Sequence, residues 1–226
     1  MLAMRRHAQQ AIALAALAMS AALPASATAK VTELGALASN IQPVCPEQCQ
    51  ALDRVTGYQA KVGPDRELYR APADGRIVSW TIALGKPSTR DVGVFEKRYG
   101  GVAQAAVVVL NSGEKLNRTV VAKAPMQKLT SHLGQTVEFP LTNTLAIKKG
   151  QYVALTVPTW APALQVGLGP DTSWRSSRGA DACLDTKPQF ALLGKRTAAL
   201  FRCLYKGVRL TYSATFINDP TATPAR

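Results

Sequence analysis

The sequence predicts an all-β protein, an antiparallel β-sandwich for which a jelly roll is one fitting arrangement. Many short apolar segments alternate with a period of two and are separated by glycines and prolines, as in strands joined by turns. Hardly any stretch shows helical periodicity. The chain of 226 residues is 47% hydrophobic and 18% charged, which is too apolar for a disordered protein. We therefore expect a packed core.

The N-terminus has the pattern of a cleavable secretory signal peptide over residues 1–29. Arg5 and Arg6 precede a mostly apolar run at residues 11–22, and Ala27-Thr28-Ala29 resembles a cleavage site. This run is well short of the roughly 20 residues that a membrane-spanning helix needs. Cleavage leaves 197 of the 226 residues with a charge of +11, and no later stretch is long and apolar enough to cross a membrane. We expect an exported protein, secreted or associated with the cell envelope.

The rest of the chain reads as one domain, because no break in composition and no internal repeat divides it. Residues 30–44 are predicted to form an N-terminal arm, with a short helix or a flexible segment at 30–40. Residues 45–218 are predicted to form the β-sandwich, and residues 219–226 a flexible tail.

The expected strands follow one another with short gaps. The strand at 76–84 follows an Asp74-Gly75 turn signal and alternates so that Val78, Trp80, Ile82 and Leu84 share one face. Trp80 is therefore predicted to lie in the core. The other strands are expected at 55–62, 102–110, 118–123, 136–141, 144–147, 152–157, 164–168 and 208–216.

The four cysteines form an even set in a chain predicted to enter an oxidising compartment, so disulfides are the first expectation. Three pairings are open, and we favour the local one, Cys45 with Cys49 and Cys183 with Cys203. Zinc is the alternative, but Cys183 and Cys203 are 20 positions apart and no histidine lies near either. We predict no metal site and no cofactor.

Few catalytic arrangements fit this sequence. After signal removal His132 is the only imidazole, and its neighbour Ser131 is poorly placed to be its nucleophile in a catalytic triad. The sequence contains no Gly-x-Ser-x-Gly elbow, no His-Glu-x-x-His motif and no phosphate-binding loop. A non-enzymatic binding protein is therefore the favoured interpretation.

A carbohydrate-active hydrolase stays open as the alternative, because glycoside hydrolysis needs only two carboxylates. No close-spaced pair stands out among the acids, and the loop with Asp171, Asp181 and Asp185 does not have the spacing of a calcium loop. A structural envelope protein is a third interpretation. The acids considered for a catalytic pair are Asp53, Glu67, Asp91, Glu96, Glu138 and Asp171.

Two tryptophans lie in loop-like sequence and are candidates for a ligand surface. Trp160 stands between Pro158 and Pro162, and Trp174 precedes Arg175. An exposed indole ring can stack on the apolar face of a sugar. Two interpretations remain open for both rings, packing beneath a loop or lining a surface that binds glycans.

Basic residues are dense in the C-terminal third and alternate with aromatic ones. Such a surface can hold nucleic acid, an acidic polysaccharide or anionic lipid head groups, and outside the cell acidic glycans and anionic wall polymers are favoured over nucleic acid. A high net charge can equally serve only to keep an exported protein in solution. The candidate binding residues are Trp160, Trp174, Arg175, Arg178 and Tyr205, within a basic set that also contains Lys187, Lys195, Arg196, Arg202, Lys206 and Arg209.

Several segments together resemble a group of exported, functionally uncharacterised β-rich proteins of high-GC soil bacteria. The resemblance rests on residues 45–49, 55–59, 75–87 around Trp80, 155–163 and 174–178, and it covers most of the mature chain. The group has no activity that can be transferred. The resemblance implies a secreted sandwich with paired cysteines.

Overall fold

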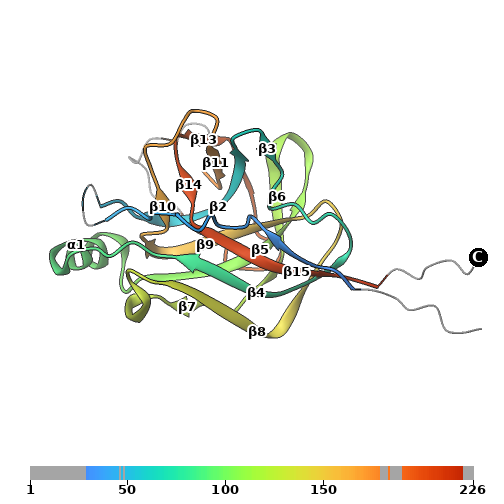
Figure 1. The fold of residues 1–226 in the computed structure, drawn as a ribbon, viewed down its shortest axis with the longest axis horizontal. Helices are drawn as coiled ribbons and strands as arrows, with labels where there is room; N and C mark the ends of the chain where they lie inside the picture. The colour runs from blue at the N-terminus through green and yellow to red at the C-terminus, as the bar shows by residue number, and fades with distance from the viewer. Residues whose placement is uncertain (1–28, 46, 48, 179–182, 184–189, 221–226) are drawn as a thin grey trace, which may run out of the picture.

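The computed structural model describes residues 29–45, 47, 49–178, 183 and 190–220, and they form an all-β protein with antiparallel sheets (Figure 1). The predicted fold class is thereby confirmed, while the jelly-roll detail stays a prediction. The predicted signal peptide lies almost wholly outside the described residues, as do residues 221–226 of the predicted tail.

The smaller sheet has four strands. It consists of β1 (Val31–Leu34), β15 (Tyr212–Asn218), β4 (Gly75–Ala83) and β8 (Thr136–Ile147), in that spatial order. β1 pairs with β15 over its whole length, and Leu34 is buried. The prediction of a helix or a flexible arm at residues 30–40 is therefore wrong, because this segment starts with a strand of the sheet.

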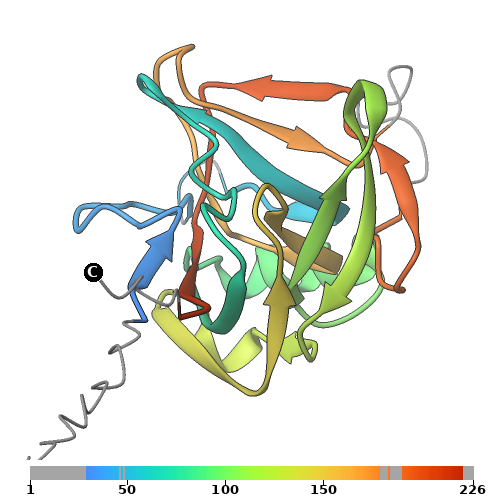
Figure 2. The same ribbon diagram turned by 90° about the vertical axis from the view of Figure 1, so that its right-hand side faces the viewer.

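The larger sheet curls into a half-barrel. Its order is β12 (Ala198–Leu200), β6 (Asn117–Lys123), β5 (Gln104–Ser112), β9 (Tyr152–Ala161), β2 (Leu52–Val62), β11 (Ser173–Ser176) and β13 (Cys203–Lys206). The short β3 (Asp65–Arg66) pairs with β2, and β7 (Gln127–Lys128) pairs with β5. β12 and β13 are the two edge strands of this sheet, and along the chain only residues 201–202 lie between them. Figure 2 shows the strands of this sheet wrapped around the interior of the half-barrel.

The remaining elements connect the sheets. β10 (Leu164–Gln165) and β14 (Arg209–Leu210) form a two-stranded ribbon, and η1 (Glu114–Leu116) and η2 (Thr130–His132) are single 3₁₀ turns. The helix α1 (Thr89–Tyr99) was not predicted. The Ser88 hydroxyl caps its start by accepting from the Asp91 amide, and Gly100 ends it in the left-handed conformation.

The main core lies between the two sheets. Trp80 is fully buried there together with Phe216 and Ile82, as predicted for Trp80. A shift in register between β4 and β8 after Ile77 places Ile77, and not Val78, among the buried residues. The predicted alternation is therefore correct after this irregularity, at Trp80 and Ile82. Before it, the buried position is one residue earlier than predicted, at Ile77 and not at Val78.

Several strand limits differ from the prediction. The segments 136–141 and 144–147 are one strand, β8, and β9 continues through Pro158 to Ala161. The last predicted strand is divided into β14 and β15, while β11, β12 and β13 were not foreseen.

Both favoured disulfides are present. Cys45 is bonded to Cys49, and Cys183 to Cys203, so no described cysteine is free. None of the helices in the described ranges has the length and apolar character required to span a membrane.

Candidate functional site

The two faces of the larger sheet carry different apolar clusters. Along β9, Val153 and Leu155 point into the core between the sheets, whereas Tyr152 and Ala154 point into the curl. This alternation follows from the period of two in a strand. The interior of the curl is therefore a second, separate apolar cluster.

Aromatic rings fill much of that interior. Tyr58 lies 5.1 Å from Tyr152 and 5.5 Å from Phe201, measured between ring centroids. Leu192 also packs into the cluster, and its amide donates to the Thr56 hydroxyl at 2.8 Å. The Thr156 hydroxyl lies 2.8 Å from that of Thr56 and donates to the Leu192 carbonyl. These bonds hold residue 192 against the strands.

Beside these rings a pocket of about 260 Å³ opens to the surface. The mouth of a curled or closed sheet is a common place for a ligand site. Four of its lining residues are basic and one is acidic. The lining residues are Tyr58, Gln59, Ala60, Lys61, Arg66, Glu67, Leu116, Arg118, Tyr152, Ser173, Arg175 and Leu204.

Arg118 is the unusual member of this lining. It stands at the start of β6, opposite Ser112 of β5 and Ala199 of β12. Only 8% of its surface is exposed, and its guanidinium lies 5.0 Å from the centre of the Tyr152 ring. Its Nε is buried without a hydrogen-bond partner, and no described residue accepts a hydrogen bond from its guanidinium or forms an ion pair with it. A buried cation without an acceptor is costly unless a ligand supplies one.

Glu67 is the only carboxylate in the pocket lining, but other groups hold it. Its Oε2 accepts from Arg70 at 2.8 Å and its Oε1 from the Tyr152 hydroxyl at 3.2 Å. The hydrogen bond from Arg70 lowers the pKa of Glu67, so this carboxylate is ionised at neutral pH. Burial, and then the charge of Glu67, raise the pKa of Tyr152, which stays protonated and acts as a donor.

The backbone around the pocket is strained at two lining residues. Glu67 has φ +62° and Leu116 has φ +69°, in the left-handed region that residues other than glycine rarely adopt. Such strain persists only where surrounding contacts hold it, and it is concentrated at functional sites.

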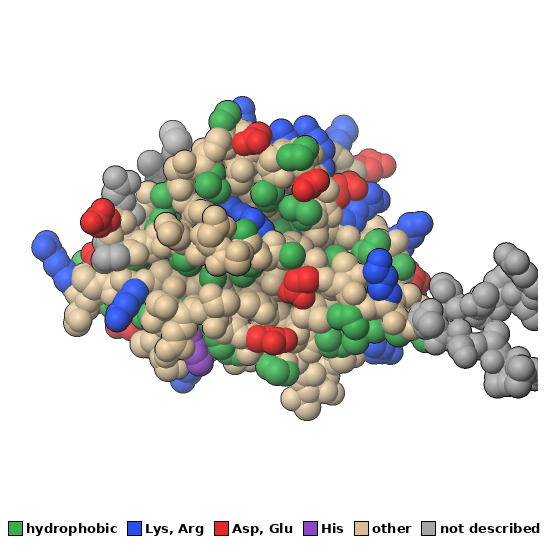
Figure 3. Space-filling model, in the orientation of Figure 1, with side chains coloured by type: hydrophobic (Ala, Val, Ile, Leu, Met, Phe, Trp, Pro, Cys, Tyr) green, Lys and Arg blue, Asp and Glu red, His purple; other side chains and the backbone are tan. Residues whose placement is uncertain are grey.

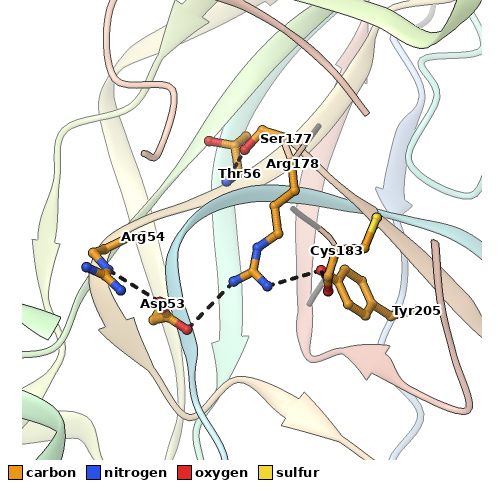
Figure 4. Close-up of polar contacts among 7 residues, drawn as sticks. All are labelled: Asp53, Arg54, Thr56, Ser177, Arg178, Cys183 and Tyr205. Carbon is orange, nitrogen blue, oxygen red and sulfur yellow. Dashed lines mark hydrogen bonds and ion pairs between the residues drawn. The ribbon is translucent and has the colours of Figure 1, made fainter. Parts of the chain in front are cut away.

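A second buried arginine shows a contrasting arrangement (Figure 4). Arg178 lies 3.7 Å from the Asp53 carboxylate, and the two side chains are 9% and 5% exposed. The Arg178 guanidinium also donates to the Tyr205 hydroxyl at 3.0 Å, and that hydroxyl donates to the Cys183 carbonyl at 3.0 Å. We call Asp53, Arg178, Tyr205 and Cys183 the Arg178 network.

The two candidate tryptophans are buried. Trp160 has no exposed surface, donates through Nε1 to the Gly101 carbonyl at 2.9 Å and packs against Phe95 of α1. Trp174 is 5% exposed and stacks on Tyr205 at 4.6 Å. The interpretation that they line an exposed sugar-binding surface is therefore wrong, and the alternative, packing inside the protein, describes both. The sequence around both residues resembles loops, but Trp160 lies in β9 and Trp174 in β11.

The other candidate residues are divided between two places. Arg175 lines the pocket and donates to the carbonyls of Phe201 and Arg202, which connect the two edges of the curled sheet. Arg178 and Tyr205 belong to the Arg178 network instead. Lys187 and the acids Asp181 and Asp185 lie outside the described residues.

The sequence prediction missed Tyr58, Arg118 and Tyr152 as site residues. One signal for Arg118 is present in the sequence: in the strand predicted at 118–123, the period of two puts Arg118 on the same face as Val120 and Ala122. A charged residue on the apolar face of a strand needs a partner or a ligand. Nothing local in the sequence connects it to Tyr58 or Tyr152.

Of the acids considered for a catalytic pair, Glu67 and Asp53 belong to different sites in the described part of the chain. Glu67 is alone in the pocket lining, and Asp53 is paired with Arg178. Within the described part of the chain, no three histidine, cysteine, aspartate or glutamate side chains form a cluster that could hold a metal ion.

Together, fold and site define an antiparallel β-protein with a cationic, tyrosine-walled pocket in the mouth of a curled sheet. No protein-family model, no curated protein and no solved structure matches the chain. The function must therefore be argued from the pocket itself.

Proposed function

We propose that this is an exported, non-enzymatic protein that binds acidic glycans or similar anionic polymers outside the cell or in its envelope. The Arg118 pocket would hold one anionic group of the ligand. The observation that carries this proposal is Arg118, a residue that is only 8% exposed, lines a pocket and has no acceptor for its guanidinium among the described residues.

The shape of the guanidinium favours a particular ligand chemistry. Its planar array of donors matches a carboxylate, sulfate or phosphate group, which can accept two parallel hydrogen bonds. The guanidinium lies 5.8 Å from the centre of the Tyr58 ring and 5.0 Å from that of the Tyr152 ring, and all three residues line the pocket. The anionic group of the ligand would form a buried ion pair with Arg118, which has no such partner among the described residues.

The rim offers contacts for the rest of the ligand. Lys61 and Arg66 extend the positive charge to the surface, and Leu204, 40% exposed, gives an apolar contact. Sugars carry hydroxyl groups that the ionised Glu67 can accept from. An acidic glycan combines these groups, which is why we favour it over a small inorganic anion.

Export is the second part of the proposal. Two disulfides fit a protein that matures in an oxidising compartment. The N-terminal sequence pattern supports the same interpretation.

Binding to immobilised acidic and neutral glycans at low and moderate salt tests the function. We expect retention on acidic glycans at low salt, weaker retention at moderate salt and an Arg118→Met affinity loss of roughly 10- to 100-fold, as for a lost charge-assisted hydrogen bond. Arg209→Met is the matched control, because Arg209 is also buried, at 9% exposure, but donates to the Ala36 carbonyl and does not line the pocket. No retention of any acidic glycan at low salt would refute the proposal.

A further inference from the structure

Two further hollows continue from the Arg118 pocket along the surface. The first is lined by Glu67, Arg70, Pro72, Lys149 and Gly150, among others, and it shares Glu67 with the pocket. Arg70 connects the two, because it donates to Glu67 and also to the Gly150 carbonyl at 3.3 Å. We call this hollow the middle hollow.

The second hollow lies on the other side of the turn at residues 148–150. It has a volume of about 420 Å³, and Lys123, Lys148, Lys195 and Gln151 are among its lining residues. We call it the lysine hollow. Lys148 lines the lysine hollow and Lys149 lines the middle hollow, so the two hollows border the same turn.

Positive charge predominates along the whole path. Four basic side chains line the Arg118 pocket, two the middle hollow and three the lysine hollow, whereas Glu67 is the only acid in any of the three linings. Arg70 already neutralises Glu67, and Asp74 pairs with Lys148. Among the described residues, Lys123, Lys149 and Lys195 form no ion pair.

The distance between the Arg118 pocket and the lysine hollow can be estimated along strand β6, which lines both. Arg118 lines the pocket and Lys123 lines the lysine hollow, five residues further along the same strand. At the usual rise in a strand this is about 16 Å. The pairing of β5 with β6 shifts in register between Val120 and Ala122, so β6 is irregular between the two sites that it lines. Figure 3 shows several lysine and arginine side chains over β3 and β6, with acidic side chains among them.

We propose that the ligand is an acidic polysaccharide bound along its length. One acidic group enters the Arg118 pocket, and the following groups cross the turn at 148–150 to Lys123 and Lys195. This inference rests on the proposed function and adds that the ligand is a chain of acidic repeats and not a single acidic sugar. Each lysine contact is weak and screened by salt, but contacts linked through one chain add up in affinity.

The test is calorimetric titration of the full chain with oligogalacturonates from the monomer to the hexamer, at low salt. A parallel series of sulfated oligosaccharides of matched length distinguishes carboxylate from sulfate as the acidic group. We expect affinity to rise with length, and the hexamer to bind roughly tenfold or more tighter than the monomer in at least one series.

A double variant isolates the lysine hollow. Lys123→Gln with Lys195→Gln should leave monomer binding unchanged and bring hexamer binding to within about threefold of the monomer, because the linked contacts are lost. The charge-matched control is Lys86→Gln with Lys128→Gln, since both lysines are exposed and neither lines any of the three hollows. The control should keep the full dependence on length.

The outcomes separate this inference from the function on which it rests. Equal affinity for monomer and hexamer would overturn the extended path and leave the single-group pocket intact. An equal loss in the control variant would also overturn it, because the charge effect would then be unspecific. Tighter binding of single-stranded DNA of similar length would overturn the assignment to a polysaccharide. Failure of every acidic oligomer to bind would refute the proposed function itself.

Discussion

Arg118 and Arg178 have similar surroundings but different partners. Both side chains are largely buried, Arg118 in β6 and Arg178 two residues after β11, and both guanidiniums lie over a tyrosine ring, at 5.0 Å from Tyr152 and 5.8 Å from Tyr205. Arg178 has the Asp53 carboxylate and the Tyr205 hydroxyl as partners, whereas Arg118 has no protein acceptor among the described residues. A buried cation with its anion is a structural element, and one without an anion is a candidate ligand site.

The largest expected effect comes from removing the anion of the Arg178 network. Asp53→Ala leaves the Arg178 charge buried without its carboxylate, and we expect a loss of about 3–5 kcal/mol in the free energy of unfolding. Urea denaturation measures it. Adding Arg178→Met to this variant should restore much of the loss, because the uncompensated charge is then gone. A loss below about 1 kcal/mol in the single variant would contradict the structural role of the pair.

The disulfide beside this network should have the next largest effect. Cys203→Ser opens the loop closed by Cys183 and Cys203, for which the chain-entropy estimate is about 3 kcal/mol. Cys45→Ser opens a much shorter loop and should cost about 2 kcal/mol. Thermal unfolding of the two variants under the same conditions should rank them in this order. The reverse order would contradict the expected dependence of disulfide stabilisation on loop length.

Arg118→Met should have little effect on stability, in contrast to the variants above. Methionine keeps the packing against Tyr58 and Tyr152 and removes a buried charge without an acceptor, so we expect the free energy of unfolding to change by less than about 1 kcal/mol or to rise. Arg209→Met, which loses the bond to Ala36, should cost about 1–3 kcal/mol. A loss of 3 kcal/mol or more for Arg118→Met would mean that Arg118 is structural, like Arg178.

The smallest effect concerns pH and the Glu67–Arg70 pair. The pKa of Glu67 is lower in the folded than in the unfolded state, so the pair stabilises the protein above the ordinary glutamate pKa and loses this effect as pH falls below it. Because both side chains are about half exposed, the gain is about 0.5 kcal/mol. The stability difference between the wild type and Glu67→Gln should therefore shrink from pH 6 to pH 3 in urea titrations. A difference that grows in this range would reverse the assigned direction of the pKa shift.

Much of the fold could be predicted from the sequence because its signals are local. The period of two around Trp80 identified β4 and its buried ring, and the spacing of the cysteines favoured the pairing that the structure contains. The helix α1 also has local signals, Ser88 with Asp91 at its start and Gly100 at its end, although its weak apolar periodicity hid them. The prolines around Trp160 misled the prediction, because Pro158 lies inside β9 at an irregularity in its pairing with β2, and Pro162 comes only after the strand ends at Ala161.

The sequence by itself determined the class of fold, the basic charge, the paired cysteines and the scarcity of catalytic groups, since each depends on composition or on neighbours along the chain. Only the tertiary structure decided which basic residues form a site. Arg118, Tyr152, Glu67 and Arg175 come from four separate segments, and the order of strands in the curled sheet brings them together. The same order places Asp53 beside Arg178, whereas Arg118 has no acceptor among the residues that the structure describes. Burial and pairing of charges are set by contacts between distant segments, and these decide whether an arginine supports the fold or is left for a ligand.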